Sequence, residues 1–227
     1  IQENAVKPIE PVFLDFKKDM SQLTAKSDIP VLYKQNTTND LFQLIYVFDM
    51  GNNNDKALGT AFDYLEYLGT SDMTPEELKS EFYRLACTFY VSAGNERTYV
   101  VLSGLNENMP AAMQLFEKLL ADAQVNKEAY NNLVGDILKA RADAKLNQGQ
   151  NFSRLMNYAM YGPKSPATNL LTEAELASMN PQELVDRIHN QNNYKHRILY
   201  YGPSSSKDLL ATIEQYHQVP ATLKDIP

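Results

Sequence analysis

The chain has 227 residues, 44% hydrophobic and 22% charged, a composition typical of a globular protein with a hydrophobic core. Its 21 basic and 28 acidic residues give a net charge of −7, which repels phosphate backbones and argues against nucleic acid as a partner. No apolar run reaches the ~20 residues of a membrane helix, so we expect no membrane span. The start at Ile1, without initiator methionine or signal peptide, suggests a processed or excised fragment.

Residues 1–28 are polar, and we expect them to form an arm or inter-domain linker before a single domain over residues 29–227. Strands are predicted at residues 31–35 and 41–50. In the second strand, apolar side chains alternate on one face, at Phe42, Leu44, Tyr46 and Phe48. Because Ile45 and Val47 make the other face apolar too, this strand is predicted to lie inside a sheet.

A helix is predicted at residues 55–68, with a buried stripe at Leu58, Ala61, Phe62 and Leu65. Thr-Pro-Glu-Glu at residues 74–77 begins the next helix, because it supplies a cap, a proline in the first position and acids in the first turn. A hairpin follows at residues 89–93 and 98–105.

Three helices are then predicted, at residues 109–120, 126–146 and 151–161. Two shorter helices begin at Thr172 and Asn180, and a late strand and a last helix follow at residues 195–201 and 206–217. Hairpin-linked strands with helices in blocks predict an α+β fold. We expect a two-layer sandwich of a mostly antiparallel sheet with helices packed on one face.

The segment with the most chemical information is Gly-Thr-Ala-Phe-Asp-Tyr-Leu-Glu-Tyr-Leu-Gly-Thr, residues 59–70. On a helix, Asp63 and Tyr67 lie one turn apart on the same face, and Glu66 lies beside them. The apolar stripe of this helix points the other way. Three polar positions are therefore expected together on a helix with a buried back.

This segment resembles the catalytic helix of the pitrilysin/insulinase family of zinc metallopeptidases, which includes the mitochondrial processing peptidase. In the family's His-x-x-Glu-His (inverzincin) motif, two histidines bind zinc and the glutamate is the general base toward zinc-bound water. The matching positions here are Asp63, Glu66 and Tyr67, so both histidines are replaced. The resemblance extends over residues 28–217, including the helix start at 74–78 and the hairpin at 92–99.

The family takes its third zinc ligand, a glutamate, from a later long helix, but the matching stretch here, residues 135–144, offers only Asp136 and Asp143. The resemblance therefore implies no catalytic residue, metal or cofactor in this chain, and zinc in a sister catalytic domain. Family members contain four homologous domains, of which the first carries the motif. By resemblance, this chain is a degenerate domain, the third of four in a longer polypeptide. It would form a wall of the proteolytic chamber, contact its sister domains and touch peptide substrate.

Two other hypotheses stay open. Asp63 and Glu66 could act as a carboxylate pair that makes the chain itself a hydrolase. Alternatively, the chain could be a free-standing adaptor of the same fold that binds peptides or another protein. Whether it is an enzyme is left undecided; we expect this chain to be non-catalytic and its parent to be a zinc metallopeptidase. An extracytoplasmic, periplasmic location is favoured for the parent.

The remaining polar residues favour structural roles. Cys87 lies in an apolar context, which predicts a buried and unreactive thiol. No two histidines have the spacing of a helical metal site, so zinc would have to gather distant residues from among His189, His196 and His217. Residues 51–55 predict a turn and helix cap in preference to a calcium loop. Arg197 and Tyr200 are interpreted as ordinary strand residues.

Overall fold

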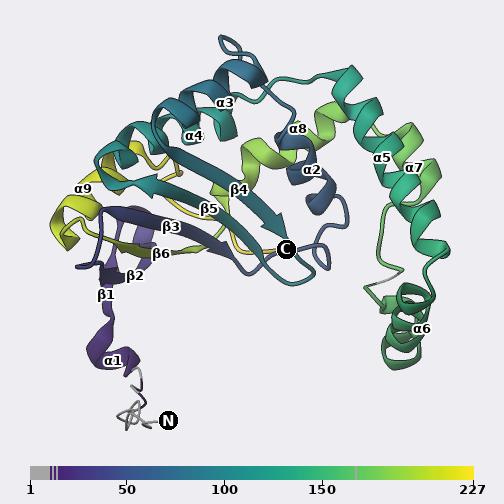
Figure 1. Ribbon diagram of the computed structural model, residues 1–227, viewed down its shortest axis with the longest axis horizontal. Coiled ribbons are helices and arrows are strands. Elements are labelled where there is room, and N and C mark those ends of the chain that lie inside the picture. The colour runs from purple at the N-terminus through teal and green to yellow at the C-terminus, as the bar shows by residue number, and fades with distance from the viewer. Residues whose placement is uncertain (1–10, 12, 14, 167) are drawn as a thin grey trace, which may run out of the picture.

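The computed structural model describes residues 11, 13, 15–166 and 168–227, and Figure 1 shows its arrangement. Six strands form one open sheet in the order β1-β2-β6-β3-β5-β4: β1 (Ser21–Thr24), β2 (Pro30–Gln35), β3 (Leu41–Phe48), β4 (Cys87–Ala93), β5 (Thr98–Leu105) and β6 (Arg197–Gly202). Every neighbouring pair is antiparallel except β2 and β6. The predicted α+β fold with a mostly antiparallel sheet is confirmed.

The last strand in the sequence, β6, lies in the middle of the sheet, between β2 and β3. Its residues alternate between buried and partly exposed, and Ile198 and Tyr200 are the buried pair that faces the helices. Ile198 lies opposite Tyr46 of β3, and Tyr200 lies opposite Tyr33 of β2. The return of the chain to the centre of the sheet therefore closes the core.

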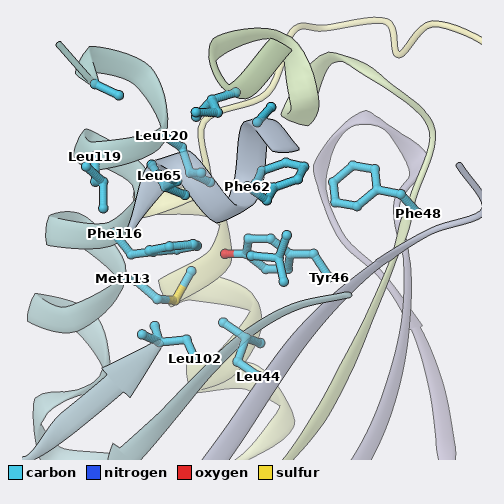
Figure 2. Close-up of a cluster of buried hydrophobic side chains, with 14 of the residues drawn as sticks. Leu44, Tyr46, Phe48, Phe62, Leu65, Leu102, Met113, Phe116, Leu119 and Leu120 are labelled. Carbon is cyan, nitrogen blue, oxygen red and sulfur yellow. The ribbon is translucent and has the colours of Figure 1, made fainter. Parts of the chain in front are cut away.

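One face of the sheet is covered by helices (Figure 1). These are α2 (Leu58–Leu65), α3 (Pro75–Arg84), α4 (Met109–Asp122), α8 (Pro181–Asn190) and α9 (Ser206–Tyr216). In Figure 2, Phe48 of β3 lies beside Phe62 of α2, Tyr46 of β3 lies beside Phe116 of α4, and Leu44 lies beside Leu102. Each of these side chains is almost completely buried. Burial of a side chain of this size contributes about 1.5–3 kcal/mol.

The helices α5 (Lys127–Lys145), α6 (Gln148–Tyr161) and α7 (Glu173–Ser178) stand beyond one end of the sheet (right in Figure 1). No residue of α6 is buried. Short 3₁₀ turns lie between the main elements, at Lys26–Asp28, Asn106–Asn108, Gly162–Lys164 and Gln191–Asn193. In the part of the chain that the structure describes, no helix combines the length and apolar character that crossing a bilayer requires.

The predicted start of α3 is confirmed by a complete capping box. The Thr74 hydroxyl accepts a hydrogen bond from the Glu77 N–H at 3.2 Å, and the Glu77 carboxylate accepts one from the Thr74 N–H at 2.8 Å. Thr172 and Glu175 make the same pair of bonds at the start of α7. Each box satisfies two backbone donors that a helix end otherwise leaves free.

Three segments differ from their prediction by more than two residues. The helix expected at 55–68 is shorter, because Asp55 accepts from the Ala57 N–H in a turn and α2 begins only at Leu58. Helix α6 begins before residue 151 because Asn147 caps it. The segment expected as a polar arm contains β1 and the single-turn helix α1 (Phe16–Asp19). β1 pairs antiparallel with β2 but has only one strongly apolar residue in Ser-Gln-Leu-Thr, so no sequence pattern indicates it.

Candidate functional site

The three motif positions lie where α2 ends. Asp63 is inside the helix, Glu66 is its C-terminal cap, and Tyr67 is already outside it. The Tyr67 N–H donates to the Tyr64 carbonyl at 3.0 Å, an i→i−3 bond that tightens the last turn. The motif requires Asp63 and Tyr67 to lie on one face of a regular α-helix, and the sequence predicted that they do. In the structure they do not, because the regular helix ends before Tyr67.

The back of α2 is fixed in the core as predicted. Leu58, Ala61, Phe62 and Leu65 are all buried. Tyr64 is fully buried as well, and its hydroxyl donates to the Asn126 carbonyl at 2.6 Å and accepts from the Asn126 N–H at 2.8 Å. This pair of bonds ties α2 to the start of α5, so the position of Asp63 is set by a rigid helix.

The motif side chains are exposed, and 44% of the Tyr67 surface is open to solvent. Partial desolvation raises the pKa of the Asp63 carboxyl, and the nearby negative charge of Glu66 raises it further. Asp136 and Asp143 of α5 are exposed too. Among the described residues, no three histidine, cysteine, aspartate or glutamate side chains are grouped to hold a metal. An acid, an acid and a phenol at a helix end do not fit zinc, which prefers imidazole and thiolate ligands.

A groove of about 450 Å³ begins beside Glu66 and runs between α3 and β4. Its lining includes Phe82, Tyr83, Phe89 and the edge of Cys87. Cys87 is buried, as predicted, and burial raises the pKa of its thiol. The groove is largely apolar, and its polar lining residues are Glu66, Lys79 and Thr88.

A buried polar cluster, which the sequence analysis did not predict, lies between the sheet and the helices. Its centre is Glu117 of α4, only 1% exposed. The carboxylate accepts four hydrogen bonds: from the Tyr46 hydroxyl at 2.9 Å, Asn192 Nδ2 at 2.9 Å, the Gln218 N–H at 3.0 Å and His217 Nδ1 at 2.6 Å. Each oxygen of the carboxylate therefore accepts two hydrogen bonds within the fold.

His196 extends the cluster. Its Nε2 lies 2.9 Å from the Nε2 of His217, and its Nδ1 lies 2.7 Å from the Tyr194 carbonyl. Burial, followed by the proximity of His217, lowers the pKa of His196 to about 4, so this ring is neutral near pH 7. Burial and the charge of Glu117 raise the pKa of Tyr46 well above its ordinary value, and Tyr46 stays a donor.

One signal in the sequence could have indicated this cluster. Glu117 lies four residues after Met113 and three before Leu120, so the helical period places it beside the buried stripe of α4. A charged residue on a buried face needs a partner. The partners come from 79 and 100 positions further on, and no local pattern could identify His196 and His217.

The remaining candidates have structural roles, as predicted. The Arg197 guanidinium pairs with Asp49 at 2.6 Å. Tyr200 is buried and stacks on Tyr33, with ring centres 5.8 Å apart. In residues 51–55 the side-chain oxygens are engaged within the protein: Asn54 accepts from the Gly51 N–H, and Asp55 pairs with Arg187. This arrangement is a turn and cap.

No family model matches the sequence, and no curated protein matches it. The fold, however, is similar to that of several proteases of known structure. The chain is similar to the periplasmic protease PqqL from Escherichia coli, with a TM-score of 0.78 at 15% identity over 93% of this chain and 24% of that one. It is also similar to the "peptidase M16 inactive domain" from Pseudomonas fluorescens, with a TM-score of 0.77 at 16% identity over 92% of this chain and 53% of that one.

A third similar structure is the ferredoxin protease FusC in complex with Arabidopsis ferredoxin. Its TM-score is 0.77 at 12% identity, and the match covers 100% of this chain and 27% of that one. The chain thus spans about a quarter of the length of two of these proteases and about half of the inactive-domain structure. At such low identities the similarity is one of fold.

Proposed function

We propose that this chain is a catalytically inactive domain of a zinc metallopeptidase, which forms a wall of the proteolytic chamber and contacts sister domains. The observation that carries the proposal is the end of α2, where Asp63, Glu66 and Tyr67 occupy the positions of the His-x-x-Glu-His motif. The fold supports it, because similar structures include proteases and one inactive peptidase domain. We propose that zinc is held by a sister domain.

The chemistry of the motif positions argues against hydrolysis by this chain. A catalytic zinc needs neutral imidazole nitrogens and one open position for water. Here the imidazoles are replaced by Asp63 and by the phenol of Tyr67, which lies beyond the helix end. Without zinc, no water near Glu66 has a lowered pKa, and this carboxylate has no nucleophile to generate.

An exposed helix supports contact with sister domains. Helix α6 presents large apolar side chains to solvent, and Leu155, for example, is 63% exposed. The set consists of Phe152, Leu155, Met156, Tyr158, Met160 and Tyr161. We call this set the α6 face. Large apolar side chains gathered on one exposed helix of a globular protein indicate an interaction site.

The charge of the same region supports an acidic partner. Residues 127–161, which contain α5 and α6, have five basic and three acidic residues, net +2. The rest of the chain has 16 basic and 25 acidic residues, net −9. A region of net positive charge is complementary to an acidic surface, and a homologous domain as acidic as this one would supply it.

The uncovered face of the sheet supports a role as a chamber wall. No helix of the described chain lies on this face (Figure 1). It exposes aromatic side chains on β4, β5 and β6: Tyr90, Tyr99 and Tyr201. Tyrosine combines apolar area with a hydroxyl group, which suits adaptable contact with peptide. We propose an extracytoplasmic location, because PqqL is a periplasmic protease.

Metal analysis and peptide cleavage test the proposal. We expect purified chain to carry far less than one zinc per molecule and to leave a fluorogenic peptide library intact. One zinc per chain, together with cleavage that Glu66→Gln abolishes and Glu76→Gln preserves, would show that the domain is itself a peptidase. Glu76 is the matched control, because it is an exposed glutamate in the first turn of α3.

A free-standing adaptor is the second candidate, and the groove beside Glu66 favours it. Its apolar lining and its volume of about 450 Å³ suit one or two side chains of a bound peptide. Gel filtration separates the two functions. An adaptor remains monomeric and binds peptide through the groove, with affinity lost in Tyr83→Ser, whereas a chamber domain binds a homologous domain through the α6 face.

A further inference from the structure

The hydrogen bonds from Glu117 through His217 to His196 fix how many protons these groups share. His196 Nδ1 lies 2.7 Å from a carbonyl, which can only accept, so the proton of the neutral ring is on Nδ1 and Nε2 is an acceptor. The 2.9 Å contact between the two Nε2 atoms needs a proton on His217 Nε2. The 2.6 Å contact of His217 Nδ1 with Glu117 needs another.

The cluster therefore holds one proton more than two neutral imidazoles and a carboxylate would hold. Placing it on His217 gives an imidazolium beside the Glu117 carboxylate, which keeps opposite charges adjacent. A cationic His196 is opposed by burial and by His217, the causes that lower its pKa to about 4. A proton on Glu117 Oε1 would make this atom a hydroxyl, a weaker acceptor for the Tyr46 hydroxyl than a carboxylate oxygen. Glu117, His217 and His196 are 1%, 0% and 6% exposed, so each charge in this cluster needs its partner.

We propose that this cluster is a latch, which keeps the C-terminal segment (residues 217–227) docked only while the cluster holds that single shared proton. His217 is the first residue of the segment. The next residue, Gln218, donates its N–H to the same Glu117 carboxylate. The inference is independent of the proposed peptidase relationship, because it rests on buried groups away from α2.

The rest of the C-terminal segment has weaker attachments. Ser27 donates to the Pro220 carbonyl at 2.7 Å, and Asn54 donates to the Pro227 carbonyl at 2.8 Å. Lys224 makes two backbone bonds with the loop before β6, and Asp225 pairs with Lys195 in an exposed ion pair. Exposed pairs of this kind contribute little, and Val219, Leu223 and Ile226 pack against the core only as partly buried side chains. His217, at the start of the segment, is fully buried, so the cluster is its most deeply buried attachment.

Two pockets adjoin the cluster, and protons can be exchanged from them when the fold opens locally. Glu117 and His217 border a pocket of about 480 Å³, whose other titratable or charged groups are Lys26 and His189. His196 borders a second pocket of about 450 Å³, with Asp28, Asp49, Lys195 and Arg197.

These surrounding charges do not replace the shared proton. Lys26 donates to the Glu214 carbonyl, His189 contacts the Ala123 carbonyl, and Arg197 pairs with Asp49. Tyr46, on β3, is a further titratable group in contact with the cluster, and it already donates to Glu117.

The latch opens on both sides of neutral pH. Loss of the shared proton leaves the Glu117 carboxylate buried without a cation and brings two nitrogen lone pairs to 2.9 Å. Gain of a second proton, on His196, brings two imidazolium ions to the same distance. In either case the contact of His217 is broken, and the segment that begins there is released.

Nitrogen-15 NMR of the imidazoles in the 227-residue chain tests the proton count. At pH 7 we expect His217 protonated on both nitrogens and His196 on Nδ1 alone. After correction for intrinsic rates, protection of the Gln218 and Lys224 amides against hydrogen exchange should be at least tenfold higher at pH 7 than at pH 4 or 10. The Val100 amide of β5 should not change. Two neutral imidazoles at pH 7, or protection that does not vary with pH, would overturn the proposal.

Two substitutions distinguish the release at alkaline pH from the release at acid pH. In Glu117→Gln, the amide can donate to Nδ1 of a neutral His217, whose Nε2–H then bonds to His196, so no extra proton is needed and alkaline release should disappear. His196→Gln keeps an acceptor that does not titrate, so acid release should disappear. His189→Gln is the control and should keep both acid and alkaline release. If both kinds of release persist in His196→Gln, the proposed latch is contradicted, even where Glu117→Gln does not fold.

Discussion

At the scale of the single residue, His196 links the stability of the whole domain to pH. Its pKa is 6.5 in an unfolded chain and about 4 in the fold. Above pH 6.5 both states are neutral at this ring. Below it the unfolded chain binds a proton that the fold resists until about pH 4, so the free energy of unfolding falls as pH falls. A shift of this size amounts to about 3 kcal/mol in total.

Urea unfolding between pH 7.5 and 4.5 measures this loss. Carboxylates with lowered pKa values, such as Glu175 at about 2, weaken the fold only near and below their unfolded value of 4.5, so the range from 6.5 to 5 isolates the histidine. We expect stability to decrease across that range in the native chain and much less in His196→Gln. Stability that stays flat or rises toward pH 5 in the native chain would contradict the burial of a neutral ring.

Ala86 is a second residue at this scale, and its backbone conformation should affect the free energy of unfolding measurably. It follows the C-terminal cap of α3 and has a φ of 49°, the left-handed conformation that glycine adopts with less strain. The side chain is exposed, so no packing is lost on its removal. We expect Ala86→Gly to stabilise the fold by about 0.5–1 kcal/mol after the entropy of the unfolded glycine is subtracted.

Chemical denaturation of Ala86→Gly beside Ala140→Gly checks this. Ala140 is an exposed alanine inside α5, where glycine should instead cost about 1 kcal/mol. Destabilisation by both substitutions would show that Ala86 is not strained.

At the scale of the element, the sequence predicts what local chemistry determines. Thr74 and Thr172 each carry a glutamate three residues later, and both begin helices with capping boxes. The hairpin of β4 and β5 and the buried interior strand β3 follow from apolar patterning. β1 does not, because its place in the sheet depends on backbone pairing with β2 and little on its side chains.

The end of α2 shows what a sequence motif does not predict, namely where the helix that carries it ends. The spacing of Asp63, Glu66 and Tyr67 fits one helical face, but only if the helix continues past Leu65. In the structure the last turn tightens and Tyr67 leaves the helix. The identity of the three residues could be predicted, whereas their common orientation could not.

Restoring the histidines should therefore not restore zinc. In the double variant Asp63→His, Tyr67→His, one imidazole would be on α2 and the other beyond its end. Residues 135–144 contain no glutamate to complete the set. Isothermal titration with zinc should show binding weaker than micromolar, comparable to a control pair on the exposed side of α3. Tight one-to-one binding would mean that the end of α2 can extend into a full turn.

At the scale of the whole molecule, the parts that the sequence could not predict are those that bring distant segments together. Glu117, His196 and His217 come from three segments, and only the sheet order, with β6 in the middle, places them in one cluster. The charged residue in a buried stripe was visible in the sequence, but its partners depended on topology. The same holds for the C-terminal segment, whose bonds reach back to residues 27 and 54.

The α6 face gives a prediction at the same scale, because its side chains have no role in the fold of the domain itself. Leu155 and Met160 are 63% and 60% exposed, so folding buries little of either. We expect Leu155→Ser, Met160→Ser to change the free energy of unfolding by less than about 0.5 kcal/mol. Phe116→Ala, in the core, should cost about 3–5 kcal/mol.

The same double variant should differ from the native chain in association. Analytical ultracentrifugation should show less self-association than in the native chain, and a homologous sister domain should bind the variant at least tenfold more weakly. Tyr83→Ser is the matched control, because Tyr83 is 88% exposed on α3, away from α6. If the double variant instead lost about 2 kcal/mol of stability with its association unchanged, the α6 face would be packing against its own chain, and the sister-domain interface would have to be elsewhere.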